Sequence, residues 1–275
     1  MIGQKQLKET FMKMIGSGAL PRAVLLVGTM GSGRKTFARE LADLCKVTII
    51  ESDIGVDNIR ELSKIASEKR DTTIYLVPNV EQMSAAGQNA MLKILEEPPN
   101  DSIFLLTTIQ ENLILPTIHS RCAVFYMESY SSEEIDSYVI QYYPEYASDT
   151  EILQMIHQIC VCPGEIDVLS TQDIKEFIKY ANLVFNNISK VSGSNSFKLS
   201  SKINLTNEPN NDKYDLIMFW KYFIQLCMEH IQEEPKRCAD AISINTKSIQ
   251  ALRVKGLNRQ MCMDMWILDI RKAWM

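Results

Sequence analysis

A glycine-rich stretch offers the clearest candidate for chemistry in this sequence. Gly28, Gly31 and Gly33 follow an apolar run at 24–27 and precede a segment with helical periodicity. Glycines let backbone N–H groups approach a ligand closely, and the N-terminus of a helix attracts anions. A strand, a glycine loop and a helix start are the plan of a loop that binds phosphate groups.

The polar residues after the last glycine depart from the sequence that this plan requires. The template G-x-x-x-x-G-K-[ST], begun at Gly28, places Arg34 at the lysine position and Lys35 at the Ser/Thr position. A register shifted by one residue uses Lys35 and Thr36 but loses both glycines. Arg34 keeps the charge on a broad planar head group, and Lys35 cannot ligate Mg²⁺. The stretch therefore indicates either weak phosphate binding or a loop retained for structure.

Alternating strands and helices must position this loop. Short apolar or β-branched runs, bounded by helical patterns, predict strands at 24–27, 47–51, 72–77, 103–107 and 123–126. Such alternation is typical of a doubly wound α/β domain with a parallel sheet. After residue 129 the patterns are helical, and 214–231 is apolar nearly all round. We expect an α/β domain at 1–128, a small helical domain at 129–172 and a larger one at 173–275, whose apolar surface predicts oligomerisation.

Composition excludes several classes of protein. The chain has 275 residues, 46% of them hydrophobic, and a net charge of −5, which argues against strong autonomous binding to DNA or RNA. The first residues lack the pattern of a signal peptide, and no apolar run is long enough to span a membrane. Seven scattered cysteines without a C-x-x-C pair predict reduced thiols, a cytoplasmic location and no metal site.

Two strings are specific enough to indicate a family. They are QNAMLKILEEPP at 88–99 and LPTIHSRC at 115–122. Together they resemble the clamp-loader branch of the AAA+ family, with support from IGQ at 2–4 and GVDNIREL at 55–62. Pro163-Gly164 and LNRQ at 257–260 resemble the delta-prime subunit of bacterial DNA polymerase III. The resemblance implies an AAA+ P-loop domain, a helical lid and an all-α collar, within a ring that loads the sliding clamp onto primed DNA.

The resemblance also identifies what an ATPase site would lack here. The Asp-Glu pair that follows the third strand in relatives, and that serves Mg²⁺ and water, is replaced by Pro78 and Asn79. Glu81 lies two residues too far along the chain to be expected to substitute. The lid position of a phosphate-sensing arginine falls at 165–167, which has no basic residue. We expect no intrinsic ATP hydrolysis and no required cofactor, with ATP and Mg²⁺ at a neighbouring subunit; weak nucleotide binding stays open.

For Arg121, in contrast, the resemblance implies a retained role in ATP hydrolysis. In the resembled family, the arginine of the Ser-Arg-Cys motif reaches the γ-phosphate of ATP on a neighbouring subunit, where such a finger can raise the rate by roughly 10³ or more. Ser120 and Cys122 are expected to position it, and a surface arginine after a turn is the alternative. Thr107 and Thr108 end the strand where relatives place a phosphate sensor, and a structural role is at least as well supported.

Three further residues resemble the family's contacts to the DNA backbone. Arg60 and Lys64 share one face of a predicted helix, and Ser84 begins another, whose N-terminus attracts phosphate. A solvated basic face is the alternative.

The sequence therefore predicts a delta-prime-like, non-hydrolysing subunit of a DNA polymerase III-type clamp loader. The expected partners are tau/gamma-like and delta-like subunits, the sliding clamp and primed DNA, without a membrane. Two alternatives remain open: an active tau/gamma-type motor with an unusual site, and an AAA+-fold interaction protein outside replication.

Overall fold

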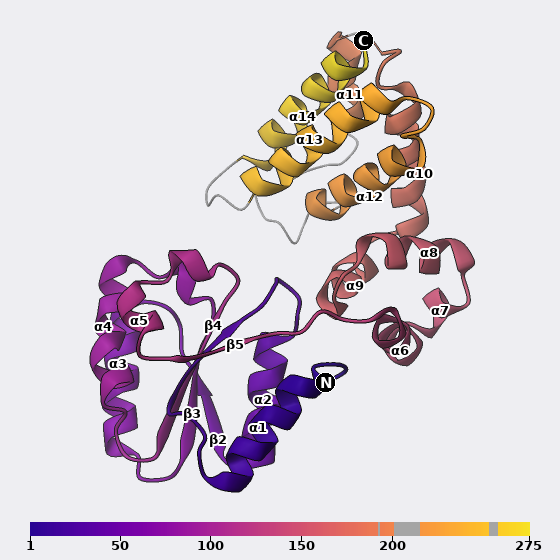
Figure 1. Cartoon of the computed structure of the whole chain (residues 1–275). Helices are drawn as coiled ribbons and strands as arrows, with labels where there is room; N and C mark the ends of the chain where they lie inside the picture. The colour runs from indigo at the N-terminus through magenta and orange to yellow at the C-terminus, as the bar shows by residue number, and fades with distance from the viewer. Residues whose placement is uncertain (192, 201–214, 253–257) are drawn as a thin grey trace. The chain divides into compact units, whose positions relative to one another are not determined.

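The computed structural model describes residues 1–191, 193–200, 215–252 and 258–275 (Figure 1). These residues form two compact units. The first contains Met1–Glu134 and Cys162–Gly164, and the second contains Ile135–Val161 and Glu165–Met275.

A five-stranded parallel sheet organises the first unit (Figure 1). Its strands are β1 (Ala23–Val27), β2 (Thr48–Glu51), β3 (Thr73–Val77), β4 (Ser102–Thr108) and β5 (Ala123–Tyr126). They lie in the order β2-β3-β4-β1-β5, and each neighbouring pair is parallel. The predicted α/β class is thereby confirmed. Because β1 lies inside the sheet, the loop after it opens at the carboxyl edge, where ligands bind in folds of this kind.

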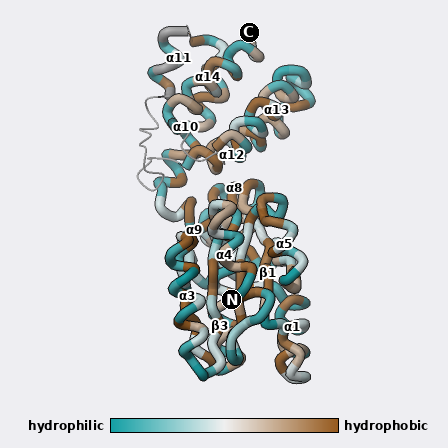
Figure 2. Tube along the Cα trace, turned by 90° about the vertical axis from the view of Figure 1, so that its left-hand side faces the viewer, coloured by the Kyte–Doolittle hydropathy of each residue, from teal (hydrophilic) through white to brown (hydrophobic). Residues whose placement is uncertain are grey.

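Helices cover both faces of the sheet because side chains alternate along each strand. Leu25 contributes to the core cluster shared with α3 (Val56–Glu68) and α4 (Ala85–Glu96). Its neighbours Val24 and Leu26 contribute to the cluster on the other face, with α1 (Lys5–Ser17) and α2 (Arg34–Cys45). Figure 2 shows this as apolar strands β1 and β3, with polar and apolar residues alternating along α1 and α3. The buried strands thus fix where the loop after β1 begins.

The second unit is helical, as predicted for the chain after residue 129. Its helices are α6 (Ser132–Tyr142, whose first residues belong to the first unit), α7 (Pro144–Ala147), α8 (Thr150–Ile159), α9 (Pro163–Ser170, whose first two residues belong to the first unit), α10 (Ile174–Asn187), α11 (Gly193–Ser200), α12 (Leu216–Glu229), α13 (Pro235–Ala251) and α14 (Arg259–Trp274). Aromatic rings fill its interior: Trp266 is 1% exposed and lies edge-on to Phe219 and Phe223. The division of these helices into lid and collar stays a prediction.

One local prediction in this unit is wrong. The Ser/Gly-rich stretch at 192–196 predicts a loop, but α11 occupies Gly193–Ser200. Tertiary packing overrides the poor helix propensity, since Ser196 and Leu199 are buried and the Tyr180 hydroxyl donates a hydrogen bond to the Leu199 carbonyl.

The sequence places Leu257, Met261, Met265 and Leu268 on one apolar stripe of the final helix, and this stripe falls partly within the described residues. Met261, Met265 and Leu268 of α14 share one exposed face, whereas Leu257 lies outside the described residues. Of the string at 257–260 that supports the resemblance, the structure describes 258–260. The Asn258 side chain caps α14.

Three observations concern other classes of site. No described helix is both long and apolar enough to cross a membrane. Within the described ranges, no group of three His, Cys, Asp or Glu side chains is arranged to hold a metal ion. The seven cysteines all lie in described positions and form no disulfide.

Candidate functional site

The glycine loop has the backbone shape of a phosphate loop. It joins β1 to α2, and the Gly28 N–H donates to the Thr108 carbonyl at the end of β4 (3.1 Å). Gly31 and Gly33 have φ angles of +81° and +84°, which L side chains rarely adopt. Gly33 is also the N-cap residue of α2, so the first N–H groups of that helix face the same loop.

Side chains of the same unit pack against each of the three glycines. A Cβ atom on Gly28 would lie 2.5 Å from Met127, one on Gly31 would lie 2.9 Å from the Cys162 sulfur, and one on Gly33 would lie 2.8 Å from Met1. Such distances are shorter than real Cβ contacts allow. The Gly164 backbone would also lie 3.1 Å from a Cβ atom on Gly31, so packing requires glycine at Gly28 and Gly31 independently of any phosphate. At Gly33 the flexible end of Met1 could move, and the φ angle of +84° is what favours glycine.

Three successive loop carbonyls are also bonded from within the first unit. The Cys162 thiol donates to the Met30 carbonyl (3.2 Å), and the Gly164 N–H donates to the Gly31 carbonyl (3.1 Å). The Tyr130 hydroxyl donates to the Ser32 carbonyl (2.8 Å). Burial raises the pKa of Tyr130 to about 12, which keeps this donor protonated. These bonds hold the loop in one backbone conformation.

The three polar residues at the start of α2 have different environments. Lys35 is paired with Glu51, which also pairs with Arg39 at 3.1 Å, and Thr36 is exposed. Arg34 alone is directed inward, with 9% of its surface exposed. Its pKa is lowered because burial disfavours the charged guanidinium, and the Glu81 carboxylate acts in the opposite direction. Only Arg34 is therefore placed to act at the loop.

The segment after β3 contains one acid, Glu81, which the sequence predicts to lie too far along the chain to replace the missing Asp-Glu pair. Asn79 adopts a left-handed conformation and its N–H donates to the Thr107 hydroxyl (3.3 Å). The one-turn helix that follows (η1, Val80–Gln82) carries Glu81, whose carboxylate oxygens are buried and whose charge acts on the pKa of Arg34.

This set of donors does not fit the Mg²⁺ and nucleotide that the resemblance implies. Lys35 stands where a hydroxyl ligand is needed, and Pro78 and Asn79 provide no carboxylate. The Met127 side chain packs against Gly28, where a Cβ atom would lie 2.5 Å from it.

Arg121, the residue that the resemblance predicts to be an arginine finger, follows the short helix α5 (Pro116–His119). Its guanidinium donates to the Thr117 carbonyl (2.9 Å) and pairs with Glu96 (3.3 Å). The Arg121 side chain is 30% exposed and that of Glu96 is 60% exposed. This pair is therefore screened by solvent and easily exchanged for another partner.

The residues flanking Arg121 have structural contacts. The Ser120 hydroxyl donates to the same Thr117 carbonyl (3.2 Å). Cys122 packs against the core cluster beneath α4, and burial raises its pKa to about 12. The thiol is thus protonated at neutral pH and packs as an apolar group.

The predicted DNA-contact residues lie on α3 and at the start of α4. Arg60 pairs with Asp57 (3.1 Å) and Lys64 with Glu68 (4.0 Å), and all four side chains are exposed. The Ser84 hydroxyl accepts the Gly87 N–H (3.2 Å), which caps α4. Each basic residue therefore has an acidic neighbour, and the exposed pairs contribute little to stability.

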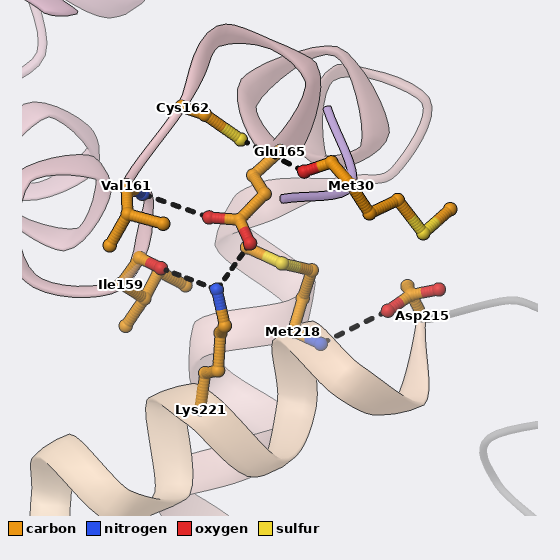
Figure 3. Close-up of polar contacts among 8 residues, drawn as sticks. All are labelled: Met30, Ile159, Val161, Cys162, Glu165, Asp215, Met218 and Lys221. Atoms are coloured by element: carbon orange, nitrogen blue, oxygen red, sulfur yellow. Dashed lines mark hydrogen bonds and ion pairs between the residues drawn. The ribbon is translucent and has the colours of Figure 1, made fainter. Parts of the chain in front are cut away.

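In the second unit, Glu165 lies at the position where the resemblance predicts the loss of a phosphate-sensing arginine. Glu165 is paired with Lys221 of α12 and accepts the Val161 N–H (2.8 Å) (Figure 3). Lys221 also donates to the Ile159 carbonyl (3.3 Å). The Glu165 carboxylate is thus engaged in holding helices of this unit together.

Comparison with known proteins identifies relatives of this chain. A family model described as DNA polymerase III, delta subunit, matches residues 41–131. The DNA polymerase III subunit gamma of Buchnera aphidicola from Acyrthosiphon pisum is 27% identical, covering 74% of this chain and 70% of the relative. This protein is a relative of the clamp-loader subunits of DNA polymerase III.

The chain spans only about a quarter of the length of another relative. The DNA polymerase III subunit tau of Escherichia coli K12 is 29% identical over 49% of this chain, but only 26% of that protein is covered. Among solved structures, a gamma subunit-related protein of DNA polymerase III from Thermotoga maritima superposes with a TM-score of 0.54 at 20% identity, covering 97% of this chain and 99% of that one. RuvB of Thermotoga maritima, a Holliday junction branch migration motor, gives 0.53 at 15% identity, covering 84% and 76%. These likenesses show that the chain shares the fold of these proteins.

Proposed function

We propose that this chain is a delta-prime-like subunit of a DNA polymerase clamp loader. In this role it does not hydrolyse ATP, and Arg121 contacts the γ-phosphate of ATP bound to an adjacent subunit. The observation that carries the proposal is the contrast between two places in the first unit. Arg121 is partly exposed and held by the screened Glu96 pair, whereas the glycine loop is bonded from within and has Pro78 and Asn79 in place of acids.

The decisive experiment reconstitutes the loader with the Arg121→Ala variant. We expect ATP turnover at the neighbouring site to fall by roughly 10³, because a finger stabilises charge that develops in the transition state. Arg121→Lys should restore only part of the rate, since an ammonium cannot form a bidentate contact. Clamp loading should fall in parallel.

Arg22→Ala is a matched control for this experiment. Like Arg121, Arg22 donates to one carbonyl, of Asn100 (2.6 Å), and pairs with one exposed acid, Asp101 (3.1 Å). Its loss should leave turnover unchanged. Undiminished turnover with Arg121→Ala would eliminate the role in trans.

A second candidate, an active motor subunit, is favoured by the similarity to gamma and tau chains. The two roles differ in what the isolated chain does with ATP. We expect no turnover above background, because no acid follows β3 directly. Appreciable hydrolysis that is abolished by Arg34→Ala would favour the motor and contradict our proposal.

The proposed partners are tau/gamma-like and delta-like subunits, the sliding clamp and primed DNA, in the cytoplasm. The exposed stripe of Met261, Met265 and Leu268 on α14 supports a collar that joins other subunits. The net charge of −5 supports contact with DNA through the assembled complex rather than by this chain alone. Co-purification that recovers neither motor subunits nor clamp would favour a role outside replication.

A further inference from the structure

The side chain of Glu111 joins the two elements that flank Arg121 in the sequence. Its Oε1 atom lies 2.6 Å from Nε2 of His119, the last residue of α5. The hydroxyl of Tyr126, the last residue of β5, donates to Oε1 at 3.1 Å and to Oε2 at 3.0 Å. One carboxylate therefore connects the end of the helix before Arg121 to the end of the strand after it.

The protonation of these three groups is consistent with the bonds between them. The pKa of Glu111 is lowered, chiefly by the bond to His119. The pKa of Tyr126 is raised, chiefly by its bond to Glu111. The carboxylate is thus ionised and the phenol protonated at neutral pH. Because an ionised carboxylate can only accept hydrogen bonds, Nε2 of His119 carries the proton in its bond, and both neighbours donate to Glu111.

Arg121 depends on α5 for its own position. Its backbone N–H donates to the Ile118 carbonyl (3.0 Å), and its guanidinium donates to the Thr117 carbonyl (2.9 Å). The helix has only four residues, too few to be stable without support from its surroundings. The contacts that hold α5 in place therefore also decide where Arg121 lies.

The two ends of α5 are held by different side chains. Gln88 of α4 is buried; it donates to the Leu113 carbonyl (3.1 Å) and accepts the Leu115 N–H (2.8 Å). These two bonds fix the chain where it enters α5. At the other end, next to Arg121, the side-chain contact comes from Glu111.

The exposure of the contacts made by Glu111 indicates a local effect. The side chains of Glu111 and His119 are 31% and 44% exposed, and Tyr126 is 58% exposed. Polar contacts as exposed as these contribute little to the stability of a whole domain. Their consequence is the relative placement of the two elements on either side of Arg121.

We propose that Glu111 is a positioning residue for Arg121. It fixes the end of α5 relative to the end of β5, and so sets where the guanidinium meets the γ-phosphate of ATP on a neighbouring subunit. This inference deepens the proposed function and rests on the role of Arg121 in trans.

The test measures ATP turnover by the reconstituted loader carrying Glu111→Ala, Arg121→Ala or both changes. Glu111→Ala should lower kcat by about tenfold or more and leave KM for ATP nearly unchanged, because a displaced finger loses contacts made in the transition state. The double variant should be no slower than Arg121→Ala alone, since Glu111 acts through Arg121. Glu111→Gln should retain more of the rate than Glu111→Ala, because the amide oxygen can still accept a hydrogen bond.

Asp101→Asn is the control for this series. It changes the net charge by the same amount, at an exposed pair with Arg22 in the same unit. It should leave kcat unchanged.

Two outcomes would overturn the inference while the role of Arg121 stands. One is an unchanged kcat with Glu111→Ala when Arg121→Ala lowers it. The other is a double variant in which the two losses multiply, because Glu111 would then act independently of Arg121. Undiminished turnover with Arg121→Ala would instead remove the proposed function, and this inference with it.

A second variant keeps the inference testable if Glu111→Ala folds poorly or does not enter the loader. His119→Leu/Tyr126→Phe removes both donors and retains Glu111. It should reproduce the loss of kcat, and only when Arg121 is present. An unchanged kcat would show that the contacts of Glu111 do not position the finger.

Discussion

The pair formed by Lys221 and Glu165 gives a sharp test of how the second unit is held together (Figure 3). The two side chains are only 24% and 20% exposed. Replacing Lys221 by Met keeps most of the apolar stem but removes the charge and the donor to the Ile159 carbonyl. Glu165 is then left with the Val161 N–H as its remaining partner among the bonds described here.

The size of the effect follows from this burial. Removing one partner of a fully buried pair costs about 3–5 kcal/mol, because the other charge stays buried without compensation. Partial exposure of both groups lowers this figure, and we expect Lys221→Met to cost about 2–3 kcal/mol of the free energy of unfolding. Glu165→Gln should cost less, since the amide oxygen can still accept the Val161 N–H. The double variant should cost less than the sum of the two single changes.

Tryptophan fluorescence during urea denaturation provides the assay. The sequence has three tryptophans, at 220, 266 and 274, and all lie in the second unit, so the signal reports the unfolding of that unit. Lys175→Met is the control, because the Lys175 side chain is 67% exposed and its partner Asp149 keeps the N–H groups of Glu151 and Ile152 as donors; its midpoint should move far less. A loss below about 1 kcal/mol for Lys221→Met, or strictly additive losses, would refute the reasoning.

Two further predictions concern buried groups. Asn245→Leu should cost about 1–3 kcal/mol, because the buried Trp266 indole N–H loses its acceptor (3.0 Å); the same denaturation assay measures it, and an unchanged midpoint would contradict the role of this bond. Cys122 has a pKa raised from 9.0 to about 12 by burial, so its thiolate fraction near pH 8 is roughly a thousandfold below that of an ordinary thiol. Iodoacetamide labelling followed by mass spectrometry should therefore be far slower at Cys122 in the folded chain than in urea, and equal rates would refute the expected protection.

The strands and their order of appearance could be predicted because their signals are local. The apolar runs at 24–27 and 72–77 stand out from their surroundings, and Ser84 marks a helix start that the structure confirms as an N-cap. Local signals failed at 193–200, where serine and glycine predict a loop. There the burial of Leu199 stabilises a helix that propensity disfavours.

The candidate site likewise has some features that the sequence predicts and others that only the structure shows. The sequence by itself determined the glycine loop, the Arg121 motif and the loss of acids at Pro78 and Asn79, since each depends only on residue type and spacing. Only the tertiary structure decided that Tyr130, Cys162 and Gly164 bond to the carbonyls of the glycine loop, because residues so far apart in the sequence meet through packing. Spacing along a chain specifies contacts within a turn or two, whereas groups from separate segments meet where the packed fold places them.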